Sequence, residues 1–227
     1  MRTVIFDLDG TLADTSGDLL AAANCCFADM GMAVRLRPET DAGVALRGGR
    51  AMLSLGIERE TGQAADKAVL DAQYQPLLRA YEQAIDVHTQ LYPGTMDAIE
   101  QLRSDGFAVG ICTNKPEYLA ELLMTKLGVR DAFASLIGAD TLPVRKPDPE
   151  PFFEAVRRAS GDSKRSCLIG DTITDHNTAR AACVPSVLVT FGPGAGAGQA
   201  DVRALQPDAL LDRYEDLPAI AAQLLGH

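Results

Sequence analysis

Short apolar runs rich in β-branched residues recur along the chain, and they constrain its fold more than any other feature. Each run has the length of a strand and is apolar at consecutive positions, which is typical of strands buried on both faces of a parallel sheet. The runs span residues 3–6, 107–112, 135–138, 166–169 and 186–189. Helical patterns lie between the later runs, at about 94–104, 116–128, 149–159 and 175–182. This alternation predicts an α/β fold with a doubly wound, Rossmann-like parallel sheet.

The interval between the first run and the second breaks this alternation. It is much longer than the roughly dozen residues that a crossover between parallel strands requires. It contains no convincing strand, and its helical patterns lie at about 17–30, 47–60 and 64–87. We therefore predict a helical cap, residues 15–89, inserted into an α/β core that residues 1–14 and 90–227 form.

The negative net charge of this chain limits the partners that it is expected to bind. Its 227 residues carry a formal net charge of −10. That charge argues against nucleic acid and anionic membrane surfaces, because both favour a basic face. An anionic small molecule is still compatible, since a bound metal ion can reverse the charge of a small site. We expect a small-molecule partner and neither nucleic acid nor membrane, and the oligomeric state is left open.

Three features of the sequence predict a cytoplasmic location. No apolar stretch approaches the roughly 20 residues that a membrane span needs. Asp7 interrupts the first apolar run too early for a signal peptide. The five cysteines are odd in number and include no C-x-x-C pair, which suits reduced thiols.

Two carboxylates follow the first predicted strand, in the segment Asp7-Leu8-Asp9-Gly10-Thr11. Residues i and i+2 of a strand point to the same side, with Cα atoms about 6–7 Å apart. Asp7 and Asp9 can therefore face one small volume, and Gly10 permits an unusual turn beside it. Carboxylates this close repel each other, and a divalent cation is a good candidate for stabilising both. The alternative is an acidic turn that merely leaves a strand.

Four segments, in order along the chain, resemble the motifs of the haloacid dehalogenase superfamily of phosphatases. The first is D-x-D-G-T at residues 7–11, and the second is Thr113-Asn114 at the end of the second strand. The third is the lysine motif, with Lys146 in R-K-P-D-P, and the fourth is G-D-x-x-x-D at residues 170–175. The likeness covers essentially the whole chain, including a helical insertion in the first loop.

The resemblance implies a Mg²⁺-dependent phosphomonoesterase that works through an aspartyl-phosphate. It implies that Asp7 is the nucleophile, while Asp9 first protonates the leaving oxygen and then activates water. Mg²⁺ would be held by Asp7, by the backbone carbonyl of Asp9 and by Asp171. Lys146 would balance the charge on the transferring phosphoryl group, as a catalytic residue.

Four other residues complete the site that the resemblance implies. Thr113 and Asn114 would donate to phosphate oxygens, and Lys115 beside them is a further candidate for binding substrate. Asp175 is expected to bind a metal-bound water or to orient Lys146. It can also act as a helix N-cap, and these roles can coexist.

Within the superfamily, the chain looks most like the phosphoglycolate phosphatases, in T-N-K at 113–115, in the residues that follow Lys146 and in 184–192. These segments frame the phosphate and say little about the leaving group. The leading substrate is 2-phosphoglycolate, and another small ester such as a sugar phosphate is the alternative. A phosphomutase of the β-phosphoglucomutase type would share all four motifs, and a non-catalytic phosphate-binding module is a further alternative. Asp9 argues against the dehalogenases, which displace halide without protonating an alkoxide.

A pair of arginines stands out in the predicted cap. The segment R-G-G-R at residues 47–50 places two cations around a flexible pair at a predicted helix start, where they could meet a substrate carboxylate. Two solvated surface arginines are the alternative. The sequence does not decide whether Arg47 or Arg50 contacts substrate, and Arg47 is the candidate taken forward.

Three further features are predicted to have no catalytic role. The Gly-rich segment at residues 192–198 follows a predicted strand but does not form G-x-G-x-x-G, so it is interpreted as a plain flexible loop. His88 and His176 are isolated in the sequence and are interpreted as structural residues.

Overall fold

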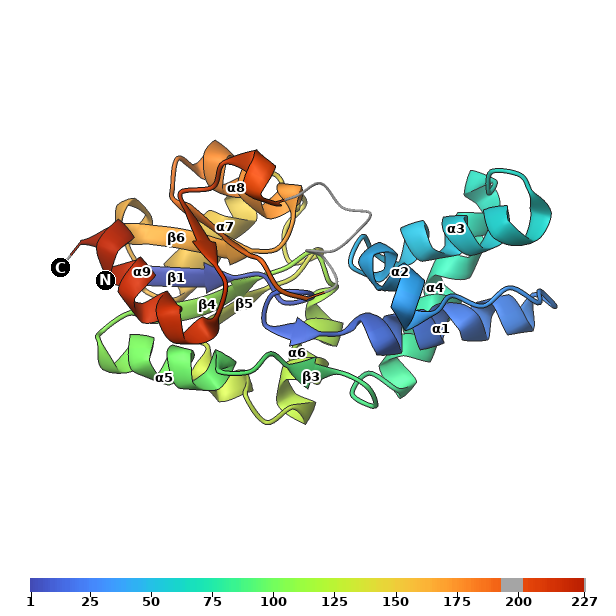
Figure 1. Cartoon of the computed structure of the whole chain (residues 1–227), viewed down its shortest axis with the longest axis horizontal. Helices are drawn as coiled ribbons and strands as arrows, with labels where there is room; N and C mark the ends of the chain where they lie inside the picture. Colours follow the sequence, from blue (N-terminus) through green and yellow to red (C-terminus); the bar gives the residue numbers. More distant parts are fainter. Residues whose placement is uncertain (193–201, 227) are drawn as a thin grey trace. The chain divides into compact units, whose positions relative to one another are not determined.

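The computed structural model of the chain describes residues 1–192 and 202–226, which form two compact units (Figure 1). Unit 1 comprises Met1–Ala13 and Leu91–His227, and unit 2 comprises Asp14–Gln90. The chain passes between them at two strands of two residues each, β2 (Ala13–Asp14) and β3 (Gln90–Leu91). Neither strand is long enough to produce a recognisable pattern in the sequence. No helix among the described residues is both long and apolar enough to cross a membrane.

Unit 1 is built on a six-stranded sheet in the order β5-β4-β1-β6-β7-β8, with every neighbouring pair parallel. This confirms the predicted α/β fold. The strands are β1 (Thr3–Phe6), β4 (Ala108–Cys112), β5 (Ser135–Ile137), β6 (Ser166–Gly170), β7 (Ser186–Val189) and β8 (Ala209–Leu211). The first five coincide with the five apolar runs. The sequence did not reveal β8, because this edge strand has only three residues and none of them is β-branched.

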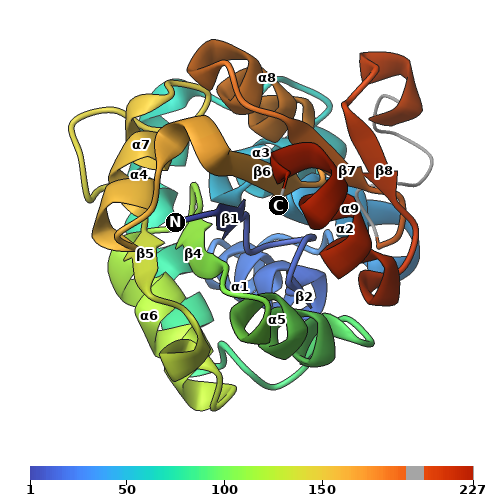
Figure 2. The ribbon, with the colours of Figure 1, turned by 90° about the vertical axis from the view of Figure 1, so that its left-hand side faces the viewer.

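Helices cover both faces of this sheet (Figure 2). One face carries α7 (Glu150–Arg158) and α8 (Ile173–Ala182), packed over a core that includes Ile5, Phe152 and Leu168. The other face carries α5 (Thr95–Ser104), α6 (Glu117–Lys126) and α9 (Leu217–Leu225). The described residues also include four short 3₁₀ helices: η1 (Arg130–Ala132), η2 (Ser163–Arg165), η4 (Val202–Leu205) and η5 (Tyr214–Asp216).

The order of the strands determines where a ligand can bind. From β1 the chain adds β4 and β5 on one side, and it then returns to add β6, β7 and β8 on the other side. The direction of winding therefore reverses beside β1. In open parallel sheets, ligands bind beyond the carboxyl ends of the strands at such a reversal. The loops after β1 and β6 meet at this point, since Phe6 is in register with Ile169.

Unit 2 is helical within the described residues. It contains α1 (Ser16–Asp29), α2 (Pro38–Ala45), α3 (Gly49–Thr61) and α4 (Lys67–Gln83). The ring of Phe27 is buried against Gly56, where a Cβ atom would lie only 2.1 Å from the ring. Helix α2 has no apolar stripe that could reveal it in the sequence, and it begins instead at Pro38, a favoured residue at a first helical position.

Candidate active site

The loop after β1 turns sharply and presents two carboxylates. The backbone N–H of Asp7 donates to the Ile169 carbonyl at 2.8 Å, which extends the pairing of β1 with β6 by one residue. The chain then turns at Gly10, whose φ of 82° lies in the left-handed region that suits glycine. Both side chains are largely buried, with 12% of the Asp7 side chain and 17% of the Asp9 side chain exposed.

The loop after β6 brings in Asp171 and Asp175. Residue 170 has to be glycine, because a Cβ atom there would lie 2.4 Å from the carboxyl carbon of Asp175. Asp175 Oδ2 accepts hydrogen bonds from the Thr172 backbone N–H at 3.1 Å and from the Thr172 hydroxyl at 2.6 Å. The bond from the Thr172 backbone N–H is one half of the capping box of α8, and in the other half the Thr172 side chain accepts from the backbone N–H of Asp175. The N-cap of α8 is thus Thr172, and Asp175 is the third residue of the helix, so the prediction of Asp175 as the N-cap was wrong.

Lys146 lies between two of these carboxylates and is buried. Its Nζ is 2.6 Å from Asp175 Oδ1 and 3.0 Å from Asp7 Oδ1. These charges raise the pKa of Lys146 above its ordinary value against the opposing effect of burial, so the ammonium stays charged. Asp175 therefore holds the lysine with one oxygen and caps α8 with the other.

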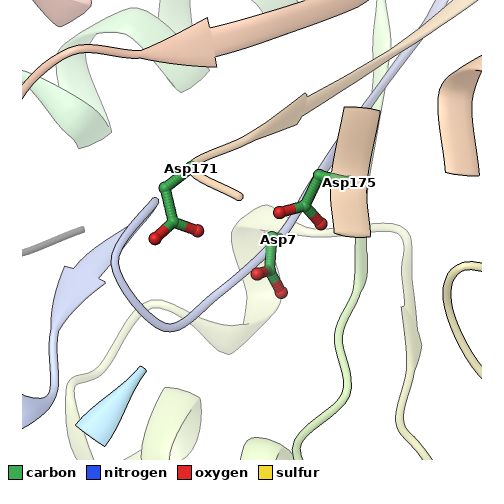
Figure 3. Close-up of side chains that lie close together, drawn as sticks. All are labelled: Asp7, Asp171 and Asp175. Carbon is green, nitrogen blue, oxygen red and sulfur yellow. The ribbon is translucent and has the colours of Figure 1, made fainter. Parts of the chain in front are cut away.

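The buried carboxylates could hold a metal ion. Asp7, Asp171 and Asp175 each place a carboxylate oxygen within 4.8 Å of the others, and Figure 3 shows the three side chains converging on one volume. Both oxygens of Asp175 already have partners. Asp171 Oδ1 accepts from the Thr11 hydroxyl at 3.2 Å, but Asp171 Oδ2 is buried without a hydrogen-bond partner. A buried carboxylate oxygen without a donor is costly, and a cation would satisfy it.

The charge balance of the cluster leads to the same conclusion. Burial raises the pKa of Asp7 to about 6, and Lys146 only partly opposes this increase. Burial also raises the pKa of Asp171, and the charges of Asp175 and Asp7 raise it further. One ammonium is thus insufficient to stabilise three buried carboxylates. The residues present fit a divalent cation, with Asp7 and Asp171 as the carboxylates able to accept it.

Three residues after β4 line the same edge of the sheet, but two of them already have partners. The amide of Asn114 donates to the Lys146 carbonyl at 3.0 Å. The ammonium of Lys115 donates to Asp9 Oδ1 at 2.7 Å, although it was a candidate for binding substrate. The Thr113 hydroxyl accepts from the Lys115 backbone N–H at 3.1 Å, which leaves its own proton available to a ligand. The spacing of these residues gave no sign of the contact between Lys115 and Asp9.

The two arginines of the R-G-G-R segment, residues 47–50, differ in their surroundings. Arg50 forms an ion pair with Asp71, and its guanidinium lies over the ring of Tyr74, 4.7 Å from the centroid. Arg47 is exposed, and its guanidinium has no hydrogen bond or ion pair among the described residues. Of the two arginines of the R-G-G-R segment, Arg47 is therefore the one whose guanidinium is available to meet an anion.

The features interpreted as structural have local partners where they are described. His176 Nδ1 lies 3.0 Å from the Ser186 hydroxyl, and the backbone N–H of His88 donates to Asp18 at 2.9 Å. The Gly-rich segment continues beyond Gly192 into residues 193–198, which lie outside the described part of the chain. Sequence reasoning missed the contact of the Thr11 hydroxyl with Asp171, although Thr11 belongs to the D-x-D-G-T segment.

Comparison with known proteins identifies the family. A model described as haloacid dehalogenase-like hydrolase matches residues 4–189. The chain belongs to the haloacid dehalogenase-like hydrolase family. A relative from this family named phosphoglycolate phosphatase, from Xanthomonas campestris, is 37% identical over 92% of this chain and 94% of its own length. A protein of the same name from Mesorhizobium japonicum is 36% identical over 98% and 95%.

Solved structures support the haloacid dehalogenase-like fold. A predicted phosphoglycolate phosphatase from Haemophilus somnus superimposes with a TM-score of 0.81 at 21% identity, covering 97% of each chain. A hydrolase from Pseudomonas syringae superimposes with a TM-score of 0.73 at 20% identity, covering 100% of each chain. At these identities the structural likeness concerns the fold. This hydrolase family, together with the relatives named phosphoglycolate phosphatase, identifies the chain as a phosphatase that acts on a small phosphate ester.

Proposed function

We propose that this enzyme is a Mg²⁺-dependent phosphomonoesterase that converts 2-phosphoglycolate to glycolate and phosphate. The observation that carries the proposal is the buried pair of Asp7 and Asp171 at the carboxyl ends of β1 and β6, with buried Lys146 3.0 Å from Asp7. The substrate is proposed from the relatives named phosphoglycolate phosphatase, which match nearly the whole chain. The cytoplasmic location stays a prediction.

The chemistry divides into two displacements at phosphorus. An oxygen of Asp7 attacks the phosphorus atom, the bond from phosphorus to the leaving oxygen breaks, and Asp9 gives its proton to that oxygen. Water then attacks the aspartyl-phosphate, Asp9 takes a proton from the water, and the bond from Asp7 to phosphorus breaks. Dividing hydrolysis in this way replaces one difficult step by two easier ones. General acid and base catalysis of the kind proposed for Asp9 typically increases the reaction rate by about 10²–10⁴-fold.

The other residues of the cluster orient these groups and balance charge. Asp7, the backbone carbonyl of Asp9 and Asp171 would hold Mg²⁺, which when bound neutralises charge on the transferring phosphoryl group. Lys146 would contact a phosphoryl oxygen while Asp175 keeps its ammonium in place, 2.6 Å away. Thr113 would donate its free hydroxyl proton to the phosphate. For Asn114 and Lys115 we propose supporting roles, through the Lys146 carbonyl and the Asp9 carboxylate.

The response of stability to Mg²⁺ should depend on pH. Burial raises the folded-state pKa of Asp7 to about 6 and also raises that of Asp171. The cation-free protein therefore loses stability as the pH rises from about 4 through about 6, because Asp7 must give up its proton in a buried site, and the ionisation of buried Asp171 adds to this loss. Mg²⁺ offsets this loss by binding the ionised carboxylates. We expect Mg²⁺ to raise the melting temperature more at about pH 8 than at about pH 5.

Thermal melts at matched ionic strength would measure this effect. Asp171→Asn is the control, since it removes one of the two carboxylates and should shrink the Mg²⁺-dependent rise at the higher pH. An equal rise at both pH values would contradict the assignment of these carboxylates to the cation.

We further propose that residues 15–89 act as the cap that reads the substrate, with Arg47 meeting its carboxylate. Arg47→Ala is then expected to raise KM for 2-phosphoglycolate by about 10-fold or more, since a charge-assisted hydrogen bond contributes about 1.5–3 kcal/mol. KM for p-nitrophenyl phosphate, which has no carboxylate, should change little. Arg50→Ala is the matched control, because Arg50 already pairs with Asp71. Equal effects of Arg47→Ala on both substrates would leave Arg47 as a surface residue.

A panel of small phosphate esters, assayed with and without Mg²⁺, tests the proposed function. Phosphate release and isomerisation of sugar phosphates are both measured. The proposal expects Mg²⁺-dependent phosphate release, fastest with 2-phosphoglycolate. Isomerisation without phosphate release would indicate a phosphomutase. Faster phosphate release from a sugar phosphate would make that ester the substrate in place of 2-phosphoglycolate. No turnover of any ester would indicate a phosphate-binding module.

A further inference from the structure

A buried tyrosine from the last part of the chain contacts the catalytic loop. Tyr214 begins η5, and its side chain is 1% exposed. Its hydroxyl donates a hydrogen bond of 2.7 Å to the backbone carbonyl of Thr11, 203 residues away in the sequence. Burial raises the pKa of Tyr214 well above its ordinary value, so the hydroxyl keeps the proton that it donates. This contact links the C-terminal segment to the turn that carries Asp7 and Asp9.

The residue that Tyr214 holds is itself bonded to the cluster. Thr11 is fully buried, and its hydroxyl donates to Asp171 Oδ1 at 3.2 Å. This bond leaves Asp171 Oδ2 as the oxygen without a hydrogen-bond partner. One residue thus accepts from Tyr214 with its carbonyl and donates to Asp171 with its side chain. The orientation of the Asp171 carboxylate depends on where this residue is held.

The ring of Tyr214 is fixed by its neighbours, so that its hydroxyl has little freedom. Phe191 packs against it with ring centroids 5.5 Å apart, and Tyr92 packs on Phe191 at 4.9 Å. Gly94 approaches from the start of α5, where a Cβ atom would lie 3.3 Å from the Tyr214 Cβ. Well-packed aromatic rings lose rotamer freedom, and a hydroxyl carried by such a ring has a defined position.

We propose that Tyr214 is a positioning residue for Asp171, acting through Thr11 to aim the free carboxylate oxygen at the bound cation. The proposal rests on the proposed function, in which Asp171 holds Mg²⁺. Partners that orient a ligating carboxylate typically change metal affinity by about 10–100-fold when they are removed. We expect the lower end of this range for Tyr214, since it acts through one intervening residue.

The test uses Tyr214→Phe, which keeps the ring and removes only the hydroxyl. The melting temperature is measured as a function of Mg²⁺ concentration, because this reports binding without turnover. We expect Tyr214→Phe to need an about tenfold higher Mg²⁺ concentration to reach half of the full increase in melting temperature. KM for the phosphate ester should change little, and kcat should approach the wild-type value when Mg²⁺ is saturating.

Two comparisons separate positioning from a general loss of stability. Tyr92→Phe removes another buried hydroxyl from the same aromatic cluster and should leave the Mg²⁺ dependence unchanged. Thr11→Val should weaken Mg²⁺ binding, and Thr11→Ser should restore most of it. In the Thr11→Val background, Tyr214→Phe should have little further effect, because the route to Asp171 is already broken.

Each other outcome would overturn the proposal. An unchanged Mg²⁺ dependence in Tyr214→Phe, or effects of Tyr214→Phe and Thr11→Val that simply multiply, would show that Tyr214 does not act through Thr11. Asp171→Asn serves as the reference that distinguishes this failure from failure of the proposed function. If Asp171→Asn binds Mg²⁺ with the same affinity as the wild type, both the assignment of Asp171 to the metal and the role of Tyr214 are rejected.

Discussion

Asp7→Asn is expected to release phosphate at least about 10⁴-fold more slowly than the wild type, since loss of a nucleophile removes the covalent route altogether. The folded state should tolerate the change. Burial makes the charge of Asp7 unfavourable, as its pKa of about 6 indicates, and the amide that replaces it carries none. Lys146 keeps its closer partner Asp175, at 2.6 Å. We therefore expect a melting temperature within a few degrees of the wild-type value.

Steady-state phosphate release at saturating Mg²⁺ measures the activity, and a thermal melt of the same preparation measures the fold. Asp208→Asn is a suitable control, because Asp208 accepts a hydrogen bond from the Ser186 backbone N–H and lies outside the cluster of Asp7, Asp171 and Asp175. Substantial turnover by well-folded Asp7→Asn would reject Asp7 as the nucleophile.

Lys146→Met should damage both stability and activity. Lys146 is buried between Asp7 and Asp175, so its removal leaves two buried carboxylates without compensation. Breaking a buried ion pair typically costs about 3–5 kcal/mol, which for a chain of this size lowers the melting temperature by roughly 10 °C. Activity should fall by about 10²–10³-fold, as expected when one preorganised donor to the transition state is removed.

The loss of stability in Lys146→Met can be assigned by comparison. Lys164→Met removes an exposed lysine and should leave the melting temperature unchanged. Adding Asp7→Asn to Lys146→Met removes one of the two uncompensated carboxylates, so the double variant should melt above Lys146→Met alone. A double variant that melts lower still would show that the loss comes from packing and not from charge.

The parts of the fold that the sequence predicted are those determined by local pattern. Strands such as β1 and β6 are buried at every position and are apolar after their first residue, and this signature is visible without any tertiary contact. Their neighbouring positions in the sheet bring Asp7 and Asp171 to one edge. The edge strand β8 is also apolar, but it has only three residues and none of them is β-branched, so it does not stand out in the sequence.

The contacts that the sequence did not predict join residues that are distant along the chain. Lys115 pairs with Asp9 across 106 positions, and Tyr214 bonds to Thr11 across 203. Neither pair of residues is related by a helical or strand period or belongs to one sequence motif. Such contacts depend on how the helices and loops pack against the sheet. The sequence indicates which residues lie at the ends of the strands. It does not indicate which partner each of their side chains contacts in the folded protein.

The central claim is that Asp7 forms an aspartyl-phosphate, and trapping that intermediate tests it most directly. Asp9→Asn should accumulate the intermediate from p-nitrophenyl phosphate, because this leaving group needs little protonation while hydrolysis still needs a base. The reaction is quenched with acid, reduced with borohydride, and the peptide that contains residue 7 is analysed by mass spectrometry. The account predicts homoserine at position 7 that appears only with substrate and Mg²⁺. Reduction at another residue, or an unmodified residue 7 during a measured burst of p-nitrophenol, would contradict it.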